Sequence, residues 1–176
     1  MRTLQLSNLN KRHHGVSQGI AAAYKEAAEV CLGRHHGPPK TFKLTYNGSS
    51  MEAEAHWVSP SARLQAAWGN QIDTTEAGAY CIALAAIEIT CGLYAVSRAE
   101  TKSGADYYLA PTGSAPTDLE SLIRLEVSGI DAGDSKTVAT RLAQKIKQLQ
   151  SGTSNTPGIA SIVGFNQLVV QSANIP

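Results

Sequence analysis

Two short apolar stretches, each with one carboxylate, constrain this chain more than any other feature. Residues 104–109 read Gly-Ala-Asp-Tyr-Tyr-Leu and place Asp106 among apolar neighbours; residues 123–129 read Ile-Arg-Leu-Glu-Val-Ser-Gly and do the same for Glu126. Both stretches are typical of strands, and burying a carboxylate costs free energy unless it is paired, hydrogen-bonded or bound to a metal. Two such carboxylates on successive strands of one sheet are therefore expected to share a purpose.

Composition limits the class of protein. The chain has 176 residues, which suits one domain with an appended element, and its charged fraction of 16% is below the usual value of about 25%. A net charge of +1 neither favours nor excludes a nucleic acid partner. The longest apolar run, residues 77–96, contains Glu88 and two glycines, which favours a buried helix leading into a strand over a membrane span. We expect a cytoplasmic protein that does not enter a membrane.

Hydrophobic periodicity and turn residues predict the order of elements. Residues 1–14 are polar and are expected to form a loose arm. Asp73 and Glu76 match a capping box at the start of a helix. The expected elements are a helix over 15–32, a β-hairpin over 41–58, a helix over 74–91, strands over 93–99 and 105–109, a strand within 119–130, a helix over about 133–150, and one or two strands within 159–170. A boundary near residue 60 divides an N-terminal helix and β-hairpin, 1–60, from an α/β core, 61–176.

Helix, three strands, helix and strand is the core order of the restriction-endonuclease-like, or PD-(D/E)xK, nucleases. Residues 73–172 resemble this superfamily, whose αβββαβ core belongs to the mixed α+β and α/β folds. Members carry an acid on the second core strand, an Asp/Glu-x-Lys motif on the third, and in many cases a glutamate on the first helix. The resemblance assigns these positions to Asp106, Glu126 and Glu76 in turn.

The sequence departs from the family pattern at two positions. Ala105 replaces the proline before the aspartate, and Ser128 replaces the lysine that follows the second acid. In some members the following helix supplies that lysine, and Lys145 is the candidate here. Arg141, Lys145 and Gln148 share one face of that helix because they are spaced at i, i+4 and i+7.

The resemblance implies metal-dependent hydrolysis of nucleic acid phosphodiesters by a Mg²⁺-dependent endonuclease. Mg²⁺, or Mn²⁺, prefers oxygen ligands, neutralises the phosphate and lowers the pKa of an attacking water. Glu76, Asp106 and Glu126 would be the metal ligands. The catalytic residues would be Asp106, Glu126 and Lys145, with Ser128, Arg141 and Gln148 as accessory residues.

Each of these residues also has a structural interpretation. Glu76 completes the capping box, Asp106 bonds to nearby backbone in a turn, Glu126 pairs with Arg124, and the charged face of the last helix is solvated. Two other classes of function follow from these interpretations. One is a catalytically inactive, nuclease-like binding or regulatory subunit. The other is an immunity-type interaction protein of a defence or mobile-element system, with the N-terminal helix and hairpin contacting a protein partner or a second copy of the chain.

Overall fold

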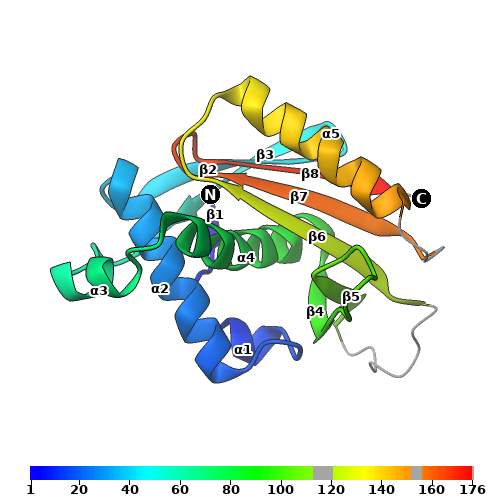
Figure 1. Cartoon of the computed structure of the whole chain (residues 1–176), viewed down its shortest axis with the longest axis horizontal. Helices are drawn as coiled ribbons and strands as arrows, with labels where there is room; N and C mark the ends of the chain where they lie inside the picture. The colour runs from blue at the N-terminus through cyan, green and yellow to red at the C-terminus, as the bar shows by residue number, and fades with distance from the viewer. Residues whose placement is uncertain (113–120, 152–155, 176) are drawn as a thin grey trace.

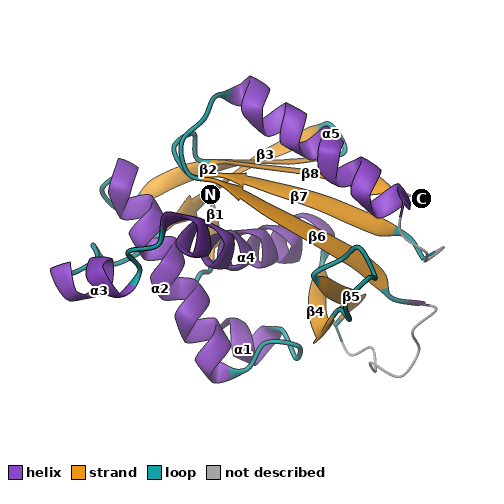
Figure 2. Cartoon of the chain, viewed as in Figure 1, coloured by secondary structure: helices purple, strands orange, loops and turns teal. Residues whose placement is uncertain are grey.

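The computed structural model of the protein describes residues 1–112, 121–151 and 156–175 as a mixed α+β fold (Figures 1 and 2). The helices are α1 (Leu9–Arg12), α2 (Gln18–His35), α3 (Ala62–Ala67), α4 (Gln71–Cys91) and α5 (Ser135–Ser151). The strands are β1 (Arg2–Leu4), β2 (Lys40–Tyr46), β3 (Ser49–Ala55), β4 (Leu93–Arg98), β5 (Tyr107–Pro111), β6 (Ile123–Ile130), β7 (Gly158–Gly164) and β8 (Val169–Ile175). They form one eight-stranded sheet in the order β1-β3-β2-β8-β7-β6-β5-β4.

Helices cover both faces of this sheet. Helix α5 lies across one face, while α4, with α2 beside it, lies across the other (Figure 1). The alternation of β6 follows from this arrangement, because Leu125 and Val127 enter the core that α4 also forms, whereas Glu126 and Ser128 contact side chains of α5. The same strand therefore supplies apolar side chains to one layer and polar side chains to the other.

The order α4-β4-β5-β6-α5-β7 matches the helix, three strands, helix and strand predicted from the sequence. Strands β4, β5 and β6 are antiparallel neighbours, and β6 runs parallel to β7. The pairing of β5 with β6 extends only from Leu109 opposite Ile123 to Tyr107 opposite Leu125. Beyond Leu125, β6 therefore continues without a β5 neighbour, and this open stretch of its edge positions the candidate site.

Two predictions about local structure are wrong. Residues 2–4 are not part of a loose arm, because they form β1 in parallel with β3, and Leu4 and Leu9 are fully buried. The capping box is also absent, because α4 begins three residues earlier than predicted: the side chain of Asn70 accepts hydrogen bonds from the backbone N–H groups of Ile72 and Asp73. Glu76 is thereby released from the capping role that the sequence had suggested.

The N-terminal helix and hairpin share the sheet and the core with the rest of the chain. The predicted hairpin is confirmed as β2 and β3, and β2 pairs in parallel with β8. Helix α2 packs closely on α4 at Gly78, where a Cβ atom would lie 3.0 Å from the backbone nitrogen of Ala28. Among the described residues, no helix is long and apolar enough to cross a membrane.

Close packing also fixes α4 against β6. A Cβ atom at Gly129 would lie 2.5 Å from the carbonyl oxygen of Thr75, so only glycine allows this approach. The contact sets the distance between the N-terminal half of α4 and the open part of β6. The N-terminal half of α4 and the open part of β6 both line the pocket described next.

Candidate functional site

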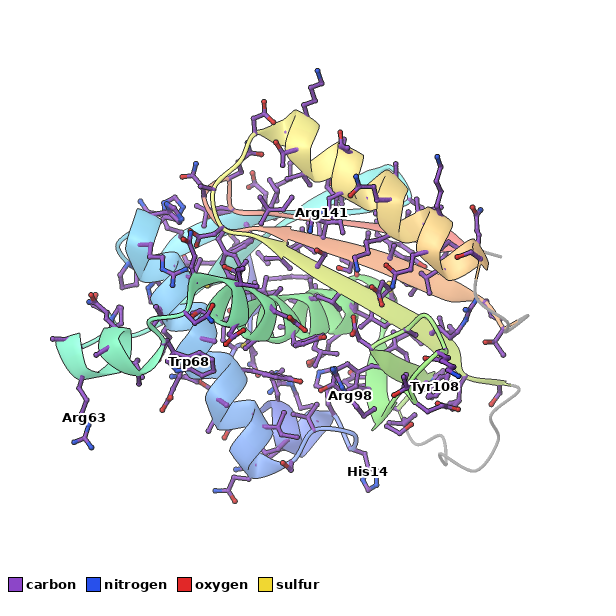
Figure 3. All side chains as sticks on the ribbon, viewed as in Figure 1. His14, Arg63, Trp68, Arg98, Tyr108 and Arg141 are labelled. Carbon is purple, nitrogen blue, oxygen red and sulfur yellow. The ribbon has the colours of Figure 1, made fainter. Side chains whose placement is uncertain are left out.

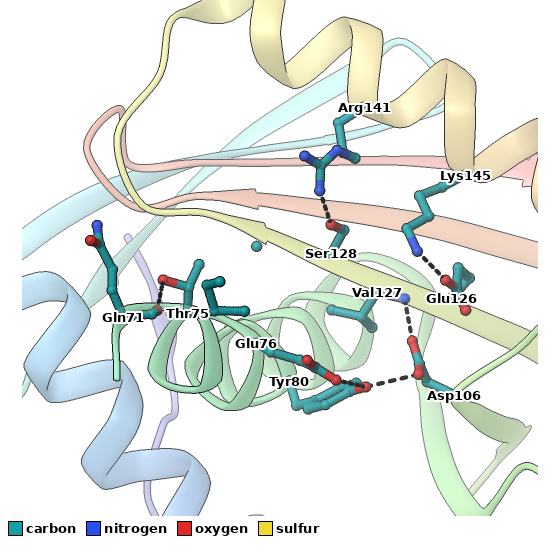
Figure 4. A pocket seen from close by; sticks show the side chains of 12 residues that line it. Gln71, Thr75, Glu76, Tyr80, Asp106, Glu126, Val127, Ser128, Arg141 and Lys145 are labelled. Atoms are coloured by element: carbon teal, nitrogen blue, oxygen red, sulfur yellow. Dashed lines mark hydrogen bonds and ion pairs between the residues drawn. The ribbon is translucent and has the colours of Figure 1, made fainter. Parts of the chain in front are cut away.

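A pocket of about 490 Å³ lies at the open edge of β6, between α4 and α5 (Figure 4). The predicted site residues that line it are Glu76, Asp106, Glu126, Ser128, Arg141 and Lys145. The seventh, Gln148, bonds to two of them, Glu126 and Lys145, from α5. Residues separated by up to 69 positions, from Glu76 to Lys145, are thus brought to one place by the order of the strands.

Asp106 lies immediately before β5 and uses both carboxylate oxygens. Oδ2 accepts a hydrogen bond of 2.8 Å from the backbone N–H of Val127, which has no β5 partner, and Oδ1 accepts one of 2.8 Å from the hydroxyl of Tyr80. The interpretation of Asp106 as a turn residue with local bonds is therefore wrong. Ser103 makes those local bonds instead, through Ala105.

Glu126 is buried, with 5% of its surface exposed, and its partners come from α5. Its Oε1 accepts hydrogen bonds from Lys145 Nζ at 2.5 Å and from Gln148 Nε2 at 3.0 Å. Burial, and then the nearby Asp106 carboxylate, raise the pKa of Glu126 to about 7, although Lys145 opposes both effects. The two carboxylates are thus close enough to repel one another.

Arg124 does not pair with Glu126, contrary to the structural interpretation of this glutamate. Its guanidinium donates to the backbone carbonyls of Ser103, Leu149 and Thr156. Glu126 consequently depends on α5 for its ion pair, which Lys145 supplies.

Tyr80 is a site residue that the sequence analysis missed. Its hydroxyl donates to Asp106 and lies 3.4 Å from Oε1 of Glu76, which is exposed at the margin of the pocket. Burial, and then the Asp106 charge, raise the pKa of Tyr80, so the hydroxyl keeps its proton. The signal in the sequence was a tyrosine one helical turn after Glu76, followed by a run of apolar helix residues.

Positively charged side chains lie on both sides of the carboxylates. Arg98 of β4 places its guanidinium carbon 4.7 Å from the ring centroids of both Tyr80 and Tyr107, and its Nη2 is 4.0 Å from Asp106 Oδ1. Arg141 of α5 donates to Ser128 Oγ at 2.9 Å. Asp106 and Glu126 therefore lie between cationic groups, an arrangement suited to an anionic ligand that also brings a cation.

Comparison with protein-family models, curated proteins and solved structures finds no match to this chain. The geometry of the site therefore carries the functional argument. Within residues 1–112, 121–151 and 156–175, no three His, Cys, Asp or Glu side chains are grouped closely enough to form a metal-ligand cluster. Asp106 and Glu126 lie close enough to interact, and Glu76 contacts the Tyr80 hydroxyl that also donates to Asp106.

The raised pKa of Glu126 predicts a stability effect that depends on pH. Because the folded state holds this proton more tightly than the unfolded chain, stability should be lost as pH rises from about 4.5 toward about 7. Glu126→Gln imitates the protonated form, so it should gain stability over the wild type by about 2 kcal/mol more at pH 8 than at pH 5. Thermal or urea unfolding at the two pH values measures this difference.

The matched control is Glu52→Gln, the same change at an exposed position of the hairpin. We expect its effect on stability to be small at both pH values. If Glu126→Gln were equally or more destabilising at pH 8 than at pH 5, the ion pair with Lys145 would outweigh burial, and Glu126 would serve the scaffold.

Proposed function

We propose that this protein is a divergent, metal-dependent nuclease-like protein that binds and hydrolyses phosphodiesters of nucleic acid. The observation that carries the proposal is the meeting of Asp106, Glu126 and Lys145 in one pocket at the open edge of β6. Desolvated carboxylates that repel one another are costly to a scaffold. A cation shared between them, with a phosphate beside it, would offset that cost.

The arrangement of elements supports the proposal. Helix α4, the antiparallel β4-β5-β6, helix α5 and the parallel β7 follow the order expected of a restriction-endonuclease-like core. In this order Asp106 lies immediately before the second strand, β5, and Glu126 lies on the third, β6, which are the two strands on which the family pattern would place its acids. The order of elements alone does not establish an activity, so the proposal depends on the side chains in the pocket.

The donor set fits a hard divalent cation. Asp106 and Glu126 would hold Mg²⁺ or Mn²⁺ through carboxylate oxygens. Glu76 lies next to the same tyrosine hydroxyl as Asp106 but, among the described residues, does not group with these two carboxylates as a third ligand. When bound, such an ion would neutralise the phosphate and lower the pKa of a water. The larger part of the rise in the Glu126 pKa comes from burial, and the part that comes from the Asp106 charge fits this role, because a cation between the two carboxylates would relieve their repulsion.

Lys145 replaces the lysine that is missing at Ser128. Its ammonium group reaches Glu126 from α5 rather than from β6, and the side chain remains about one-fifth exposed to the pocket. From there it would donate to a phosphate oxygen and stabilise the charge that develops during hydrolysis. Gln148 also accepts from Lys145 Nζ, at 3.1 Å, and this contact holds the lysine near Glu126.

A second candidate function keeps nucleic acid binding without catalysis. Lys145 already neutralises Glu126, and the described residues contain no cluster of three metal ligands. Both observations favour an inactive nuclease-like binding or regulatory subunit. In that case the pocket would bind a phosphate backbone through its cations alone.

The deciding experiment is a cleavage assay of the wild-type chain. Single-stranded and double-stranded DNA and RNA are incubated with Mg²⁺, with Mn²⁺, and with a chelator, and binding is measured in parallel. Metal-dependent cleavage supports the enzyme, and binding without cleavage supports the inactive subunit. If the chain neither cuts nor binds any of these substrates, both functions are excluded.

A further inference from the structure

The side chains above the carboxylates form two parallel pairs between α5 and β6. Lys145 and Arg141 are one helical turn apart on α5, and Glu126 and Ser128 are two residues apart on one face of β6. Lys145 contacts Glu126 at 2.5 Å, and Arg141 contacts Ser128 at 2.9 Å (Figure 4). The second pair repeats the first, about 6.6 Å further along the strand.

The two pairs differ in charge. The first joins a cation to a carboxylate, but the second joins a cation to a neutral hydroxyl. Among the described residues, no carboxylate lies within 4.0 Å of the Arg141 guanidinium. The side chain of Arg141 nevertheless extends from α5 toward the sheet, where it is half-buried and lines the pocket (Figure 3). A partly desolvated cation without an anionic partner is unfavourable, so the second pair is suited to an anion that comes from outside the chain.

We infer that Arg141 and Ser128 form a binding subsite for a second phosphate, next to the one held at Asp106, Glu126 and Lys145. A guanidinium group has five N–H donors in a planar fork that matches two phosphate oxygens, and the hydrogen bond to Ser128 uses only one donor. Ser128 fixes the direction of the fork and adds a hydroxyl that donates to phosphate. This inference rests on the proposed function and narrows its substrate class.

Two adjacent phosphate sites select a continuous nucleotide strand. The pairs are separated by two residues of β6, a distance comparable to that between consecutive phosphates of an extended strand. A phosphomonoester or a single nucleotide can fill only one of them. The substrate is therefore an oligonucleotide whose backbone lies along β6, with the phosphate at Arg141 directly adjacent to the reacting one.

The inference is tested by the affinity for a fluorescent single-stranded DNA of twelve nucleotides, with Ca²⁺ replacing Mg²⁺ to limit cleavage. Arg141→Gln should weaken binding roughly tenfold, because a charged hydrogen-bonding partner of phosphate is lost. It should also reduce the slope of log affinity against log salt by about 0.7, the value expected for one phosphate contact to a single strand. Arg141→Lys keeps the charge without the fork, so it should retain the slope and recover only part of the affinity.

The matched control is Lys147→Gln, which removes a cation from an exposed position on the same helix and outside the pocket. It should change the affinity by less than about twofold. If Arg141→Gln and Lys147→Gln bind alike while the wild type binds or cleaves DNA, the subsite is disproved and the proposed function survives. If the wild type shows neither activity nor affinity, both are disproved. Ser128→Ala, which removes only the hydroxyl, should lower the affinity about threefold and provides a second variant should Arg141→Gln fail to fold.

Discussion

Asp106→Asn is expected to lower the rate of metal-dependent phosphodiester cleavage by about a hundredfold or more. Asparagine has nearly the same shape, and it can still accept from the Val127 N–H and bond to the Tyr80 hydroxyl. What it loses is the negative charge that would hold the cation beside Glu126. Because that cation supplies charge stabilisation only while it is bound, the activation free energy should rise by at least about 2.7 kcal/mol.

The measurement compares cleavage rates of the wild type and the variant in Mn²⁺ on the best substrate found. The control is Asp73→Asn, the same substitution in the first turn of α4, where the side chain is exposed and outside the pocket. Asp73→Asn should retain nearly full activity, and the melting temperatures of both variants should stay within a few degrees of the wild type. If the Asp106→Asn protein cleaves as fast as the control, Asp106 takes no part in the reaction.

Asp106→Asn also tests how the charge of Asp106 affects the pKa of Glu126. Glu126 has a raised pKa because it is buried and because Asp106 is nearby. Removing the Asp106 charge should therefore let Glu126 ionise at a lower pH. Any residual activity of Asp106→Asn should accordingly rise at a lower pH than that of the wild type.

Much of the fold could be predicted from the sequence because its signals are local. Asn47 and Gly48 specify a hairpin turn, and Gly92 in a left-handed conformation ends α4 where the apolar helix pattern stops. The order of the C-terminal elements followed from such signals. β1 was missed because it is only three residues long, and its partner, β3, lies some fifty residues away.

The site was predictable only where spacing is informative. Arg141 and Lys145 lie one turn apart in any helix, and Glu126 and Ser128 share a face in any strand, so both pairs could be expected. The role of Asp106 depends on where the pairing of β5 with β6 ends, and no local sequence pattern shows how many residues of two strands will pair. Tyr80 was missed for the same reason, because its importance comes from a residue 26 positions away.

Arg124 was assigned to the wrong partner, and the correct assignment gives the largest stability effect that we expect. Arg124 is 2% exposed, and its guanidinium donates to three backbone carbonyls: Ser103 before β5, Leu149 near the end of α5, and Thr156 before β7. The Leu149 carbonyl lies in the last turn of α5, where helix carbonyls have no partner within the helix. One side chain thus joins three segments that meet behind the site.

Arg124→Met is expected to destabilise the protein by about 3 kcal/mol, which corresponds to a fall of roughly 10 °C in melting temperature. Methionine fills much of the volume but leaves the Ser103 and Leu149 carbonyls without their charged donor. Arg124→Lys should recover only a minor part, because one ammonium group cannot span three carbonyls at the arginine positions. Thermal unfolding of the two variants measures both effects.

The control is Arg63→Met, since Arg63 points into solvent from α3 (Figure 3) and should be nearly neutral. A melting temperature for Arg124→Met within about 2 °C of the wild type would mean that water satisfies these carbonyls equally well. Below its melting temperature, the Arg124→Met protein should still bind oligonucleotide, because no contact of Arg124 reaches the pocket. The two buried polar residues of β6 therefore have different surroundings: Arg124 bonds to the backbone of three segments, whereas Glu126, two residues later, lines the pocket.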